Sequence, residues 1–327
     1  MLKRFAAAAL GGLLLAGGLA GCGGEEPSGG PSGGAPDKIV MGFSQVGAES
    51  GWRTANTQSI KDAAAEAGVE LKFEDAQQKQ ENQIRAIRGF ISQGVDIIAF
   101  SPVVESGWDA VLGEAKAANI PVILTDRAVD SADTSLYKVF IGSDFVKEGE
   151  KAGEWVNTEF ASAPAPVNIV VLEGTTGSAP ANDRKEGFNK VVTDPKFKTI
   201  ASQTGEFTRA KGKEVMEAFL QAHKDIDLLY AHNDDMGLGA IEAIEAAGKK
   251  PGTDIKIITV DAVKDGMQAL ADGKINFIVE CSPLLGPQLM DLAQKVVAGE
   301  SVPARVLTEE TTFDQQQAVA ALPTRQY

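Results

Sequence analysis

Short runs of apolar residues alternate with amphipathic segments along most of the chain. Residues 38–44 (KIVMGFS) form an apolar run without the polar alternation of a half-exposed strand, which is typical of a strand buried on both faces. Residues 81–93 carry four apolar side chains at the spacing of one helical face, and Gly94 follows where a helix should end. This alternation continues to about residue 313, so the pattern predicts the parallel β-α-β units of an α/β protein.

The number of apolar runs indicates two parallel sheets flanked by helices. Strands are expected at 38–44, 69–74, 95–100, 121–125, 139–142, 167–172, 200–203, 228–231, 255–260 and 275–279. Helices are expected between them, among them 53–67, 81–93, 108–118, 211–222, 238–247 and 286–298. Two sheets of about five or six strands suit this length better than one large sheet.

We therefore expect two lobes joined by a hinge of several strands. A strand-like stretch at 304–313 follows the last long helix, and it would return the chain to the first lobe and back. The N-terminal lobe is expected to contain residues 37–143 and 281–309. The C-terminal lobe is expected to contain residues 144–280 and 310–327.

The first 36 residues differ in composition from the rest. Two basic residues precede an apolar run at 5–20, which is too short for a comfortable membrane span. The sequence LAGC that ends at Cys22 resembles the bacterial lipobox, which predicts a signal peptide at 1–21 and a lipid on Cys22. An ordinary secretory peptide with an incidental cysteine is the alternative. Residues 22–36 are rich in Gly, Ser and Pro, so we expect a flexible tether that anchors the protein to a membrane without spanning it.

Charge and cysteine content exclude several classes of protein. The chain has 31 basic and 45 acidic residues and a net charge of −14. Nucleic-acid binding relies on basic side chains that displace counterions, so no nucleic-acid partner is expected. Two cysteines and two histidines are too few for a zinc framework or a disulfide-rich scaffold. With Cys22 lipidated, Cys281 has no partner and is expected to be a small buried hydrophobic residue.

Polar residues gather at the carboxyl ends of the expected strands, where open α/β sheets bind ligands. These residues are 45–53, Asp75, Gln77, Gln78, Ser101, Asp126 and Arg127 in the first lobe, and 173–184, 205–207, 232–234, Asp261 and Glu280 in the second. Carboxylates accept from hydroxyls, a guanidinium offers a rigid fork of donors, and an aromatic ring covers the C–H face of a sugar. The set predicts a neutral polyhydroxylated ligand, bound without a nucleophile or a metal.

Several of these signals also have a structural interpretation. Asp126–Arg127 would otherwise be a surface ion pair of little consequence, and Arg184 would lie on a solvated helix face. Trp52 and Phe207 would be ordinary core aromatics. Because all four follow expected strands, contact with the ligand is the favoured interpretation.

Three further features are assigned structural roles. His232 has the side chain of a general base, but packing at the strand end is favoured, with Asn233 making the ligand contact. Asp234 and Asp235 are expected at the start of a helix. The segment Gly174–Ser178 matches no phosphate-binding motif, so a turn is favoured over an anion cradle.

Seven stretches together resemble the periplasmic sugar-binding proteins of ABC importers, of the ribose and galactose type with the two-lobe type I fold. They are GFSQVGAESGWR, DAQQKQENQI, SPVVESGW, DRAVD, ANDRKEGF, GEFTRAKGKEVMEAF and YAHNDDMGLGAI. With the strand ends, the resemblance covers about residues 37–313. ESGWR and QQKQENQ are most similar to the galactofuranose-binding branch of that family.

The resemblance implies which residues surround the sugar. They are Trp52, Arg53, Asp126, Arg127, Arg184, Phe207, Asn233, Asp261 and Glu280, with Glu49 beside Arg53 in a branch-specific loop. The implied mechanism is closure of two lobes around a monosaccharide, galactofuranose or a related galactose or pentose sugar. An ABC permease then receives the sugar. The implied protein is a monomer, lipid-anchored at the periplasmic or extracytoplasmic face of the cell envelope, with no catalysis, cofactor or metal.

Three other functions share parts of this pattern. A sugar-presenting subunit for a chemoreceptor or sensor kinase would have the same sugar site and differ in its protein partner. A regulator of the lactose-repressor type would need a helix-turn-helix before the first strand, where this sequence has the lipobox and the tether. An enzyme acting on sugars would need a poised acid and base, for which His223 and His232 are poor candidates.

Overall fold

The structure is a computed structural model that describes residues 38–327, which form one compact unit. We call these residues the body. The expected signal peptide, Cys22 and the tether lie outside the described residues. Within the body, no helix is both long and apolar enough to cross a membrane.

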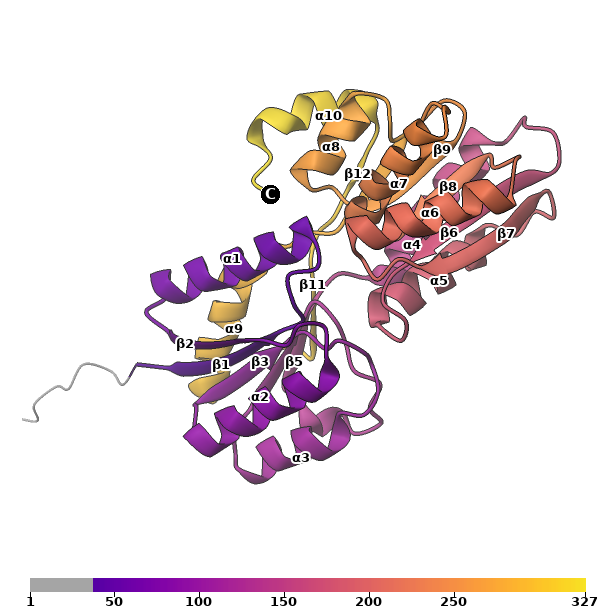
Figure 1. The fold of residues 1–327 in the computed structure, drawn as a ribbon. Coiled ribbons are helices and arrows are strands. Elements are labelled where there is room, and N and C mark those ends of the chain that lie inside the picture. The colour runs from indigo at the N-terminus through magenta and orange to yellow at the C-terminus, as the bar shows by residue number, and fades with distance from the viewer. Residues whose placement is uncertain (1–37) are drawn as a thin grey trace, which may run out of the picture. The chain divides into compact units, whose positions relative to one another are not determined.

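The first sheet of the body has six parallel strands in the order β11-β5-β4-β3-β1-β2 (Figure 1). The strands of this sheet and the helices beside it are β1 (Val40–Gln45), α1 (Gly51–Glu66), β2 (Glu70–Asp75), α2 (Gln80–Gln93), β3 (Ile97–Phe100), α3 (Asp109–Ala117), β4 (Val122–Thr125), η1 (Thr134–Leu136) and β5 (Val139–Gly142), and, later in the chain, α9 (Gly286–Val297) and β11 (Arg305–Leu307). We call this part the N-lobe.

The second sheet has the order β12-β10-β9-β8-β6-β7, in which β12 alone is antiparallel. Its elements are α4 (Phe145–Glu159), β6 (Val167–Glu173), α5 (Ala179–Val191), β7 (Phe197–Thr204), α6 (Arg209–Ala222), β8 (Leu228–Ala231), α7 (Asp234–Ala246), β9 (Lys256–Asp261), α8 (Lys264–Ala271), β10 (Phe277–Glu280), β12 (Thr312–Phe313), α10 (Gln315–Ala321) and η2 (Leu322–Thr324). We call this part the C-lobe. The two sheets confirm the expected α/β class.

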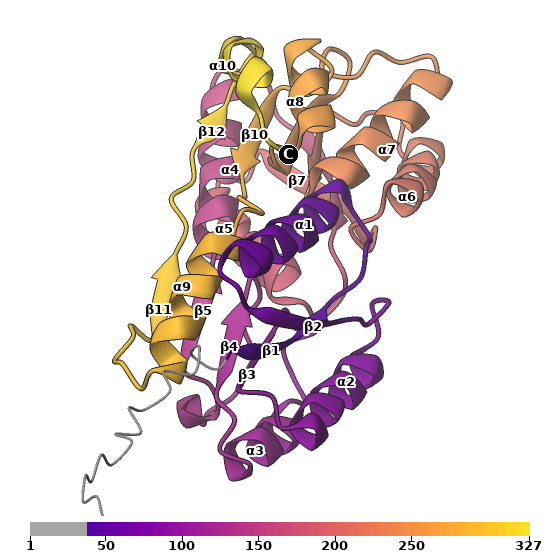
Figure 2. The same cartoon turned by 90° about the vertical axis from the view of Figure 1, so that its left-hand side faces the viewer.

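Three segments carry the chain between the lobes, after β5, after β10 and between β11 and β12 (Figure 2). The strand-like stretch expected at 304–313 forms two short strands in the structure. β11 pairs with β5 in the N-lobe, whereas β12 pairs with β10 in the C-lobe. Residues 308–311 therefore form the third crossing.

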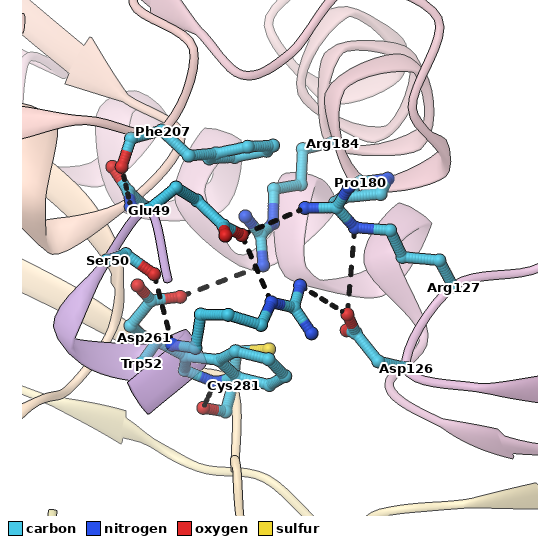
Figure 3. A pocket seen from close by; sticks show the side chains of 12 residues that line it. Glu49, Ser50, Trp52, Asp126, Arg127, Pro180, Arg184, Phe207, Asp261 and Cys281 are labelled. Carbon is cyan, nitrogen blue, oxygen red and sulfur yellow. Dashed lines mark hydrogen bonds and ion pairs between the residues drawn. The ribbon is translucent and has the colours of Figure 1, made fainter. Parts of the chain in front are cut away.

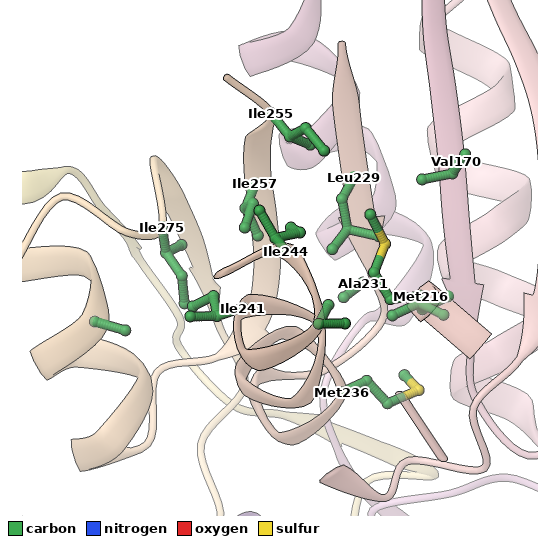
Figure 4. Close-up of a cluster of buried hydrophobic side chains, with 14 of the residues drawn as sticks. Val170, Met216, Leu229, Ala231, Met236, Ile241, Ile244, Ile255, Ile257 and Ile275 are labelled. Carbon is green, nitrogen blue, oxygen red and sulfur yellow. The ribbon is translucent and has the colours of Figure 1, made fainter. Parts of the chain in front are cut away.

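Helices cover both faces of each sheet, which explains why the strands are continuous apolar runs. All residues of β3, β4 and β8 are buried. In the C-lobe, Ile241 and Ile244 of α7 belong to one buried cluster with Leu229 of β8 and Ile257 of β9 (Figure 4). Burial of each such side chain stabilises the fold by about 1.5–3 kcal/mol.

Several element boundaries differ by a few residues from the expected ones, and two of these differences have a clear local reason. Helix α1 begins at Gly51 rather than at residue 53, because the Ser50 hydroxyl accepts a hydrogen bond from Arg53 N at 3.1 Å and caps the helix. Strand β10 begins at Phe277 rather than at residue 275. The side chain of Asn276 bonds instead to backbone atoms of Ile257 and Gly252, which places it in the turn before the strand.

Candidate functional site

The carboxyl ends of the strands of both sheets border one pocket between the lobes. The space between its lining residues amounts to about 290 Å³, including its open side. From the N-lobe it is lined by Glu49, Ser50, Trp52, Arg53, Asp126 and Arg127. The C-lobe side and the second crossing contribute Pro180, Arg184, Phe207, Asn233, Asp261 and Cys281 (Figure 3). Nine of the ten side chains expected at the site line this pocket.

The N-lobe wall is a buried cluster of two arginines and two carboxylates. Arg53 Nη2 donates to Asp126 Oδ2 at 2.7 Å, and Arg53 Nε donates to Glu49 Oε1 at 3.0 Å. Arg127 lies more loosely against the same carboxylates, with Nη2 3.7 Å from Glu49 Oε1 and Nε 3.6 Å from Asp126 Oδ2. Two positive and two negative groups leave the wall electrically balanced, so it suits a neutral ligand.

The two arginines of this wall are held differently. Burial opposes the charge of Arg53, but Asp126 and Glu49 outweigh it and raise the pKa of Arg53. Burial and the neighbouring Arg53 lower the pKa of Arg127 to about 10, so Arg127 stays charged at neutral pH. Arg53 therefore orders the two carboxylates, and Arg127 keeps donor capacity for a ligand.

A tight turn after β4 aims Asp126 into the pocket. Asp126 adopts a left-handed backbone conformation, with φ 62°, and its N–H donates to Ile141 O at 2.7 Å. A Cβ on Gly142 would lie 2.8 Å from the carbonyl oxygen of Asp126. The sequence therefore needs glycine at the end of β5 so that Asp126 can sit at the end of β4.

Arg184 of α5 dominates the C-lobe wall. Its Nε donates to Glu148 Oε2 of α4 at 2.7 Å, and its Nη1 donates to the carbonyl oxygen of His232. Its Nη2 lies 4.0 Å from Asp261 Oδ1. Burial opposes the charge of Arg184, but Glu148 outweighs it and raises the pKa of Arg184. Burial and the neighbouring Asp234 raise the pKa of Asp261 well above its usual range.

Two aromatic rings contribute to the pocket from different lobes. The Phe207 ring packs over Gly174, where a Cβ would meet the ring at 1.9 Å, and the Arg127 guanidinium lies 5.3 Å from the ring centre. Trp52 Nε1 donates to the carbonyl oxygen of Cys281 at 2.7 Å. Both rings are fixed by packing or hydrogen bonding, so they offer rigid apolar surfaces to a ligand.

Three buried polar atoms of the pocket residues have no hydrogen-bond partner within the body: Glu49 Oε2, Arg127 Nε and Asp261 Oδ2. A buried polar atom without a partner costs about 1–3 kcal/mol. A bound molecule that supplies the missing partners removes this cost. The pocket is therefore built to receive hydrogen bonds from, and donate them to, a polar ligand.

Asn233 lines the pocket at the end of β8, whereas the neighbouring His232 does not. Asn233 caps α7 by accepting from Met236 N at 2.9 Å, and its Nδ2 donates to Phe207 O at 3.1 Å, so it lines the pocket and also holds the Phe207 loop. His232 does not line the pocket, and both its ring nitrogens are buried without a hydrogen-bond partner within the body. Burial and Arg184 lower the pKa of His232 well below its usual range, so it is a neutral packing residue.

Glu280 is the expected site residue that the structure places elsewhere. Its carboxylate accepts from Arg325 Nη1 at 2.8 Å and from Thr311 N at 3.1 Å. Successive side chains of a strand point in opposite directions, so at the end of β10 it is the next residue, Cys281, that lines the pocket. The structure thus places Cys281, and not Glu280, on the pocket wall.

Sequence reasoning also missed residues that complete the site. Ser50, the N-cap of α1, and Pro180, in the first turn of α5, line the pocket. The sequence feature that could have identified them is the start of a helix shortly after each strand. Cys281 is buried, as expected, but it also faces the pocket. Glu148 is buried behind Arg184, and nothing in the sequence distinguishes it from the exposed acids of α4.

The body has the architecture and site of a protein that encloses a small ligand between two lobes, and the chain belongs to the periplasmic binding proteins. The model of the periplasmic binding protein domain matches residues 41–301. This membership confirms the expected two-lobe fold and a binding protein rather than an enzyme, and it places the chain outside the cytoplasm.

Individual relatives support the branch that the sequence resembles. The chain is 47% identical over 280 residues to the galactofuranose-binding protein YtfQ of Escherichia coli (strain K12), covering 84% of this chain and 87% of that protein. A crystal structure from Mycobacterium smegmatis in complex with β-D-fucofuranose is 69% identical, with a TM-score of 0.87, and covers 88% of this chain and 95% of that one. A second Mycobacterium smegmatis crystal structure, described without a ligand, is 66% identical with a TM-score of 0.68 over 89% and 95% of the two chains.

Proposed function

We propose that the chain is the solute-binding component of an ABC sugar importer and captures a monosaccharide in its furanose form, galactofuranose or a closely related sugar. The three unpartnered polar atoms in the pocket carry this proposal. A monosaccharide presents hydroxyls in several directions at once and can supply all three partners. The galactofuranose-binding and β-D-fucofuranose-bound relatives support the furanose form.

The pocket residues have complementary tasks in this proposal. Glu49 and Asp126 accept from hydroxyls, while Arg127 and Arg184 donate. Phe207 and Trp52 bury the C–H surfaces of the ring. Asp261 holds a proton more readily than an ordinary aspartate, so it can meet a sugar oxygen either as an acceptor or as a donor.

Capture proceeds by closure of the lobes. Ligand groups come from both lobes, which three crossings connect, so a sugar favours the arrangement in which both sets reach it.

The protein acts, in this proposal, as a lipid-anchored monomer. Cleavage before Cys22 and lipidation would leave residues 22–36 as a tether that lets the body reach the transmembrane subunits of the permease. Replacement of Cys22 by alanine should release the protein from the membrane fraction, without a change in sugar affinity of the body. Membrane association that survives the replacement would contradict the lipid anchor.

Arg127→Ala is the sharpest single test of the sugar site. The variant should lose measurable binding of D-galactose in a calorimetric titration and keep the circular dichroism spectrum of the folded protein. Arg88→Ala is the matched control, because Arg88 is an exposed N-lobe arginine paired with Glu114. Binding retained by Arg127→Ala would contradict the proposed site.

A further inference from the structure

The N-terminus of helix α1, in the N-lobe, donates a hydrogen bond to a side chain of the C-lobe. Gly51 N, at the first residue of α1, donates to Asp235 Oδ2 in the first turn of α7 at 2.7 Å. The two residues are 184 positions apart in the chain. Neither atom belongs to the set that faces the sugar pocket, so this contact joins the lobes outside the proposed sugar site.

Apart from Gly51, the groups that hold the Asp235 carboxylate belong to the C-lobe. Its Oδ1 lies 3.3 Å from Arg209 Nε, and the other side of the same guanidinium pairs with Asp265 Oδ2 at 3.1 Å. Asp235 also lies in the first turn of α7, where the helix dipole favours a negative charge. The acceptor is thus positioned before the N-lobe reaches it.

The Gly51 N–H is a donor that the N-lobe does not satisfy. The first N–H groups of a helix have no partner inside the helix. Ser50 Oγ caps α1 by accepting from Arg53 N at 3.1 Å, which leaves Gly51 N for Asp235. Any separation of the lobes breaks this bond and returns both groups to water.

The first turn of α1 is also part of the proposed sugar site. It carries Trp52 and Arg53, which line the pocket. A carboxylate at the start of α1 therefore fixes the position of these two side chains as the lobes meet. The effect of Asp235 on the sugar passes through α1.

A second contact joins the lobes at another point of the rim. Glu105, in the loop after β3, donates from its N–H to Gly177 O at 2.9 Å, and its Oε2 accepts from Asn182 Nδ2 at 2.5 Å. Gly177 and Asn182 belong to the turn before α5 and its first turns. The rim thus carries lobe-to-lobe hydrogen bonds at both α1 and α5.

We propose that Asp235 determines sugar affinity without touching the sugar, because it caps α1 across the cleft and stabilises the closed arrangement. This proposal rests on the proposed function, namely closure around a sugar. A contact made in the closed arrangement adds to the closing free energy whether or not sugar is present. Asp235 accordingly raises the fraction of closed molecules without sugar and slows sugar release.

Asp235→Ala, compared with Asp265→Ala, tests the proposal. Both variants remove a carboxylate from Arg209, but Asp265 does not contact the N-lobe in the hydrogen bonds of the body. With D-galactose as the probe, Asp235→Ala should weaken binding about tenfold, equivalent to about 1.4 kcal/mol. The loss should appear in the dissociation rate. Asp265→Ala should bind as the wild type does.

Gly51→Pro removes the donor instead of the acceptor. Proline is well tolerated at the first helical position, and the extended backbone of Ser50, with φ −145° and ψ 164°, suits a residue before proline. Gly51→Pro should weaken binding in the wild-type background and have little further effect when combined with Asp235→Ala. Equal effects in both backgrounds would overturn the proposal.

A measurement without sugar separates this proposal from the proposed function. Small-angle scattering of the ligand-free body should show a larger radius of gyration for Asp235→Ala than for Asp265→Ala. If the wild-type body binds no sugar, the proposed function is overturned. The scattering comparison of the two variants still shows whether the contact between Gly51 and Asp235 holds the lobes together. If Asp235→Ala has the sugar affinity and the radius of gyration of the wild type, the proposed role of Asp235 is overturned and the proposed function is not affected.

Discussion

Arg184 Nε donates a hydrogen bond to Glu148 Oε2 at 2.7 Å, and this buried pair connects the pocket to the hinge. Behind Arg184, one oxygen of Glu148, the Cys281 thiol and one oxygen of Glu310 lie within 4.8 Å of one another. Glu310 Oε1 accepts from Ser143 Oγ, Ser282 N and Thr308 Oγ1. These donors come from the three crossings, so one oxygen of Glu310 connects all three crossings close to Glu148, the partner of Arg184.

Loss of the Glu148 side chain should therefore impair binding without removing any group that lines the pocket. Glu148→Ala leaves the buried Arg184 guanidinium without its closest hydrogen-bond acceptor, which typically costs about 1–3 kcal/mol of stability or more. Arg184 also loses the contact that orients it, so sugar affinity should fall at least tenfold. Urea unfolding and calorimetric titration measure the two effects. Glu154→Ala, an exposed acid on the same helix, is the control, and equal behaviour of the two variants would contradict the account.

Glu148 should also make stability depend on pH. Burial raises the pKa of Glu148 to about 8, with Arg184 opposing and Glu310 adding to the shift, whereas the unfolded chain has the ordinary value of about 4.3. Between these values the folded protein holds a proton that the unfolded chain has released. Glu148 therefore contributes stability below about pH 4.3, and this contribution falls by up to about 1.4 kcal/mol per pH unit as the pH rises toward 8.

Unfolding by urea at pH 6 and pH 8 measures this dependence. The wild type should lose more stability between the two pH values than Glu148→Gln, which keeps the shape of the protonated acid and does not titrate. The same loss in both proteins would show that Glu148 does not hold the proton.

Gly174 should be required for sugar binding because of the ring above it. A Cβ at this position would lie 1.9 Å from the Phe207 ring, so Gly174→Ala must displace the ring that covers the ligand. We expect sugar affinity to fall at least tenfold, close to the loss in Phe207→Ala. Gly113→Ala in α3 is the control, since a Cβ there meets nothing within 4 Å. Unchanged affinity in Gly174→Ala would show that the ring position does not matter.

The two arginines of the N-lobe wall should differ in what they stabilise. Arg127→Met removes a charge that burial and Arg53 disfavour, so stability should stay the same or rise by about 1 kcal/mol, while sugar binding is lost. Arg53→Met removes the closest partner of both carboxylates and should cost about 3 kcal/mol of stability. Urea unfolding of the two variants decides this, and a larger loss for Arg127→Met would contradict the assignment.

Much of the fold follows from local sequence patterns. Strands buried on both faces appear as unbroken apolar runs, which is why β3, β4 and β8 lie close to their expected positions. The pattern indicates that residues 304–313 pass between the lobes, but it does not show where β11 ends and β12 begins. Both halves are short extended segments, and only their pairing with different sheets separates them.

The site was predictable as far as the strand ends define it. Residues directly after strands, such as Asp126, Arg127 and Asp261, line the pocket as the strand-end rule predicts. The rule does not predict the direction of a side chain. At the end of β10 it therefore does not show that Cys281, and not Glu280 one position before it, lines the pocket. Glu148 lies four residues into a helical segment, and its burial depends on the packing of α4 against α5 and the hinge, which has no local signal.

Calorimetric titration of the refolded body with sugars tests the central claim most directly. The body should first be unfolded and refolded to remove any bound sugar. D-Galactose, whose solutions contain a small furanose fraction, should then bind with an apparent stoichiometry set by that fraction, and methyl β-D-galactopyranoside, which is locked as a pyranose, should not bind. Full-stoichiometry binding of the locked pyranoside, or no binding of any sugar by a folded body, would contradict the assignment of a furanose-binding protein.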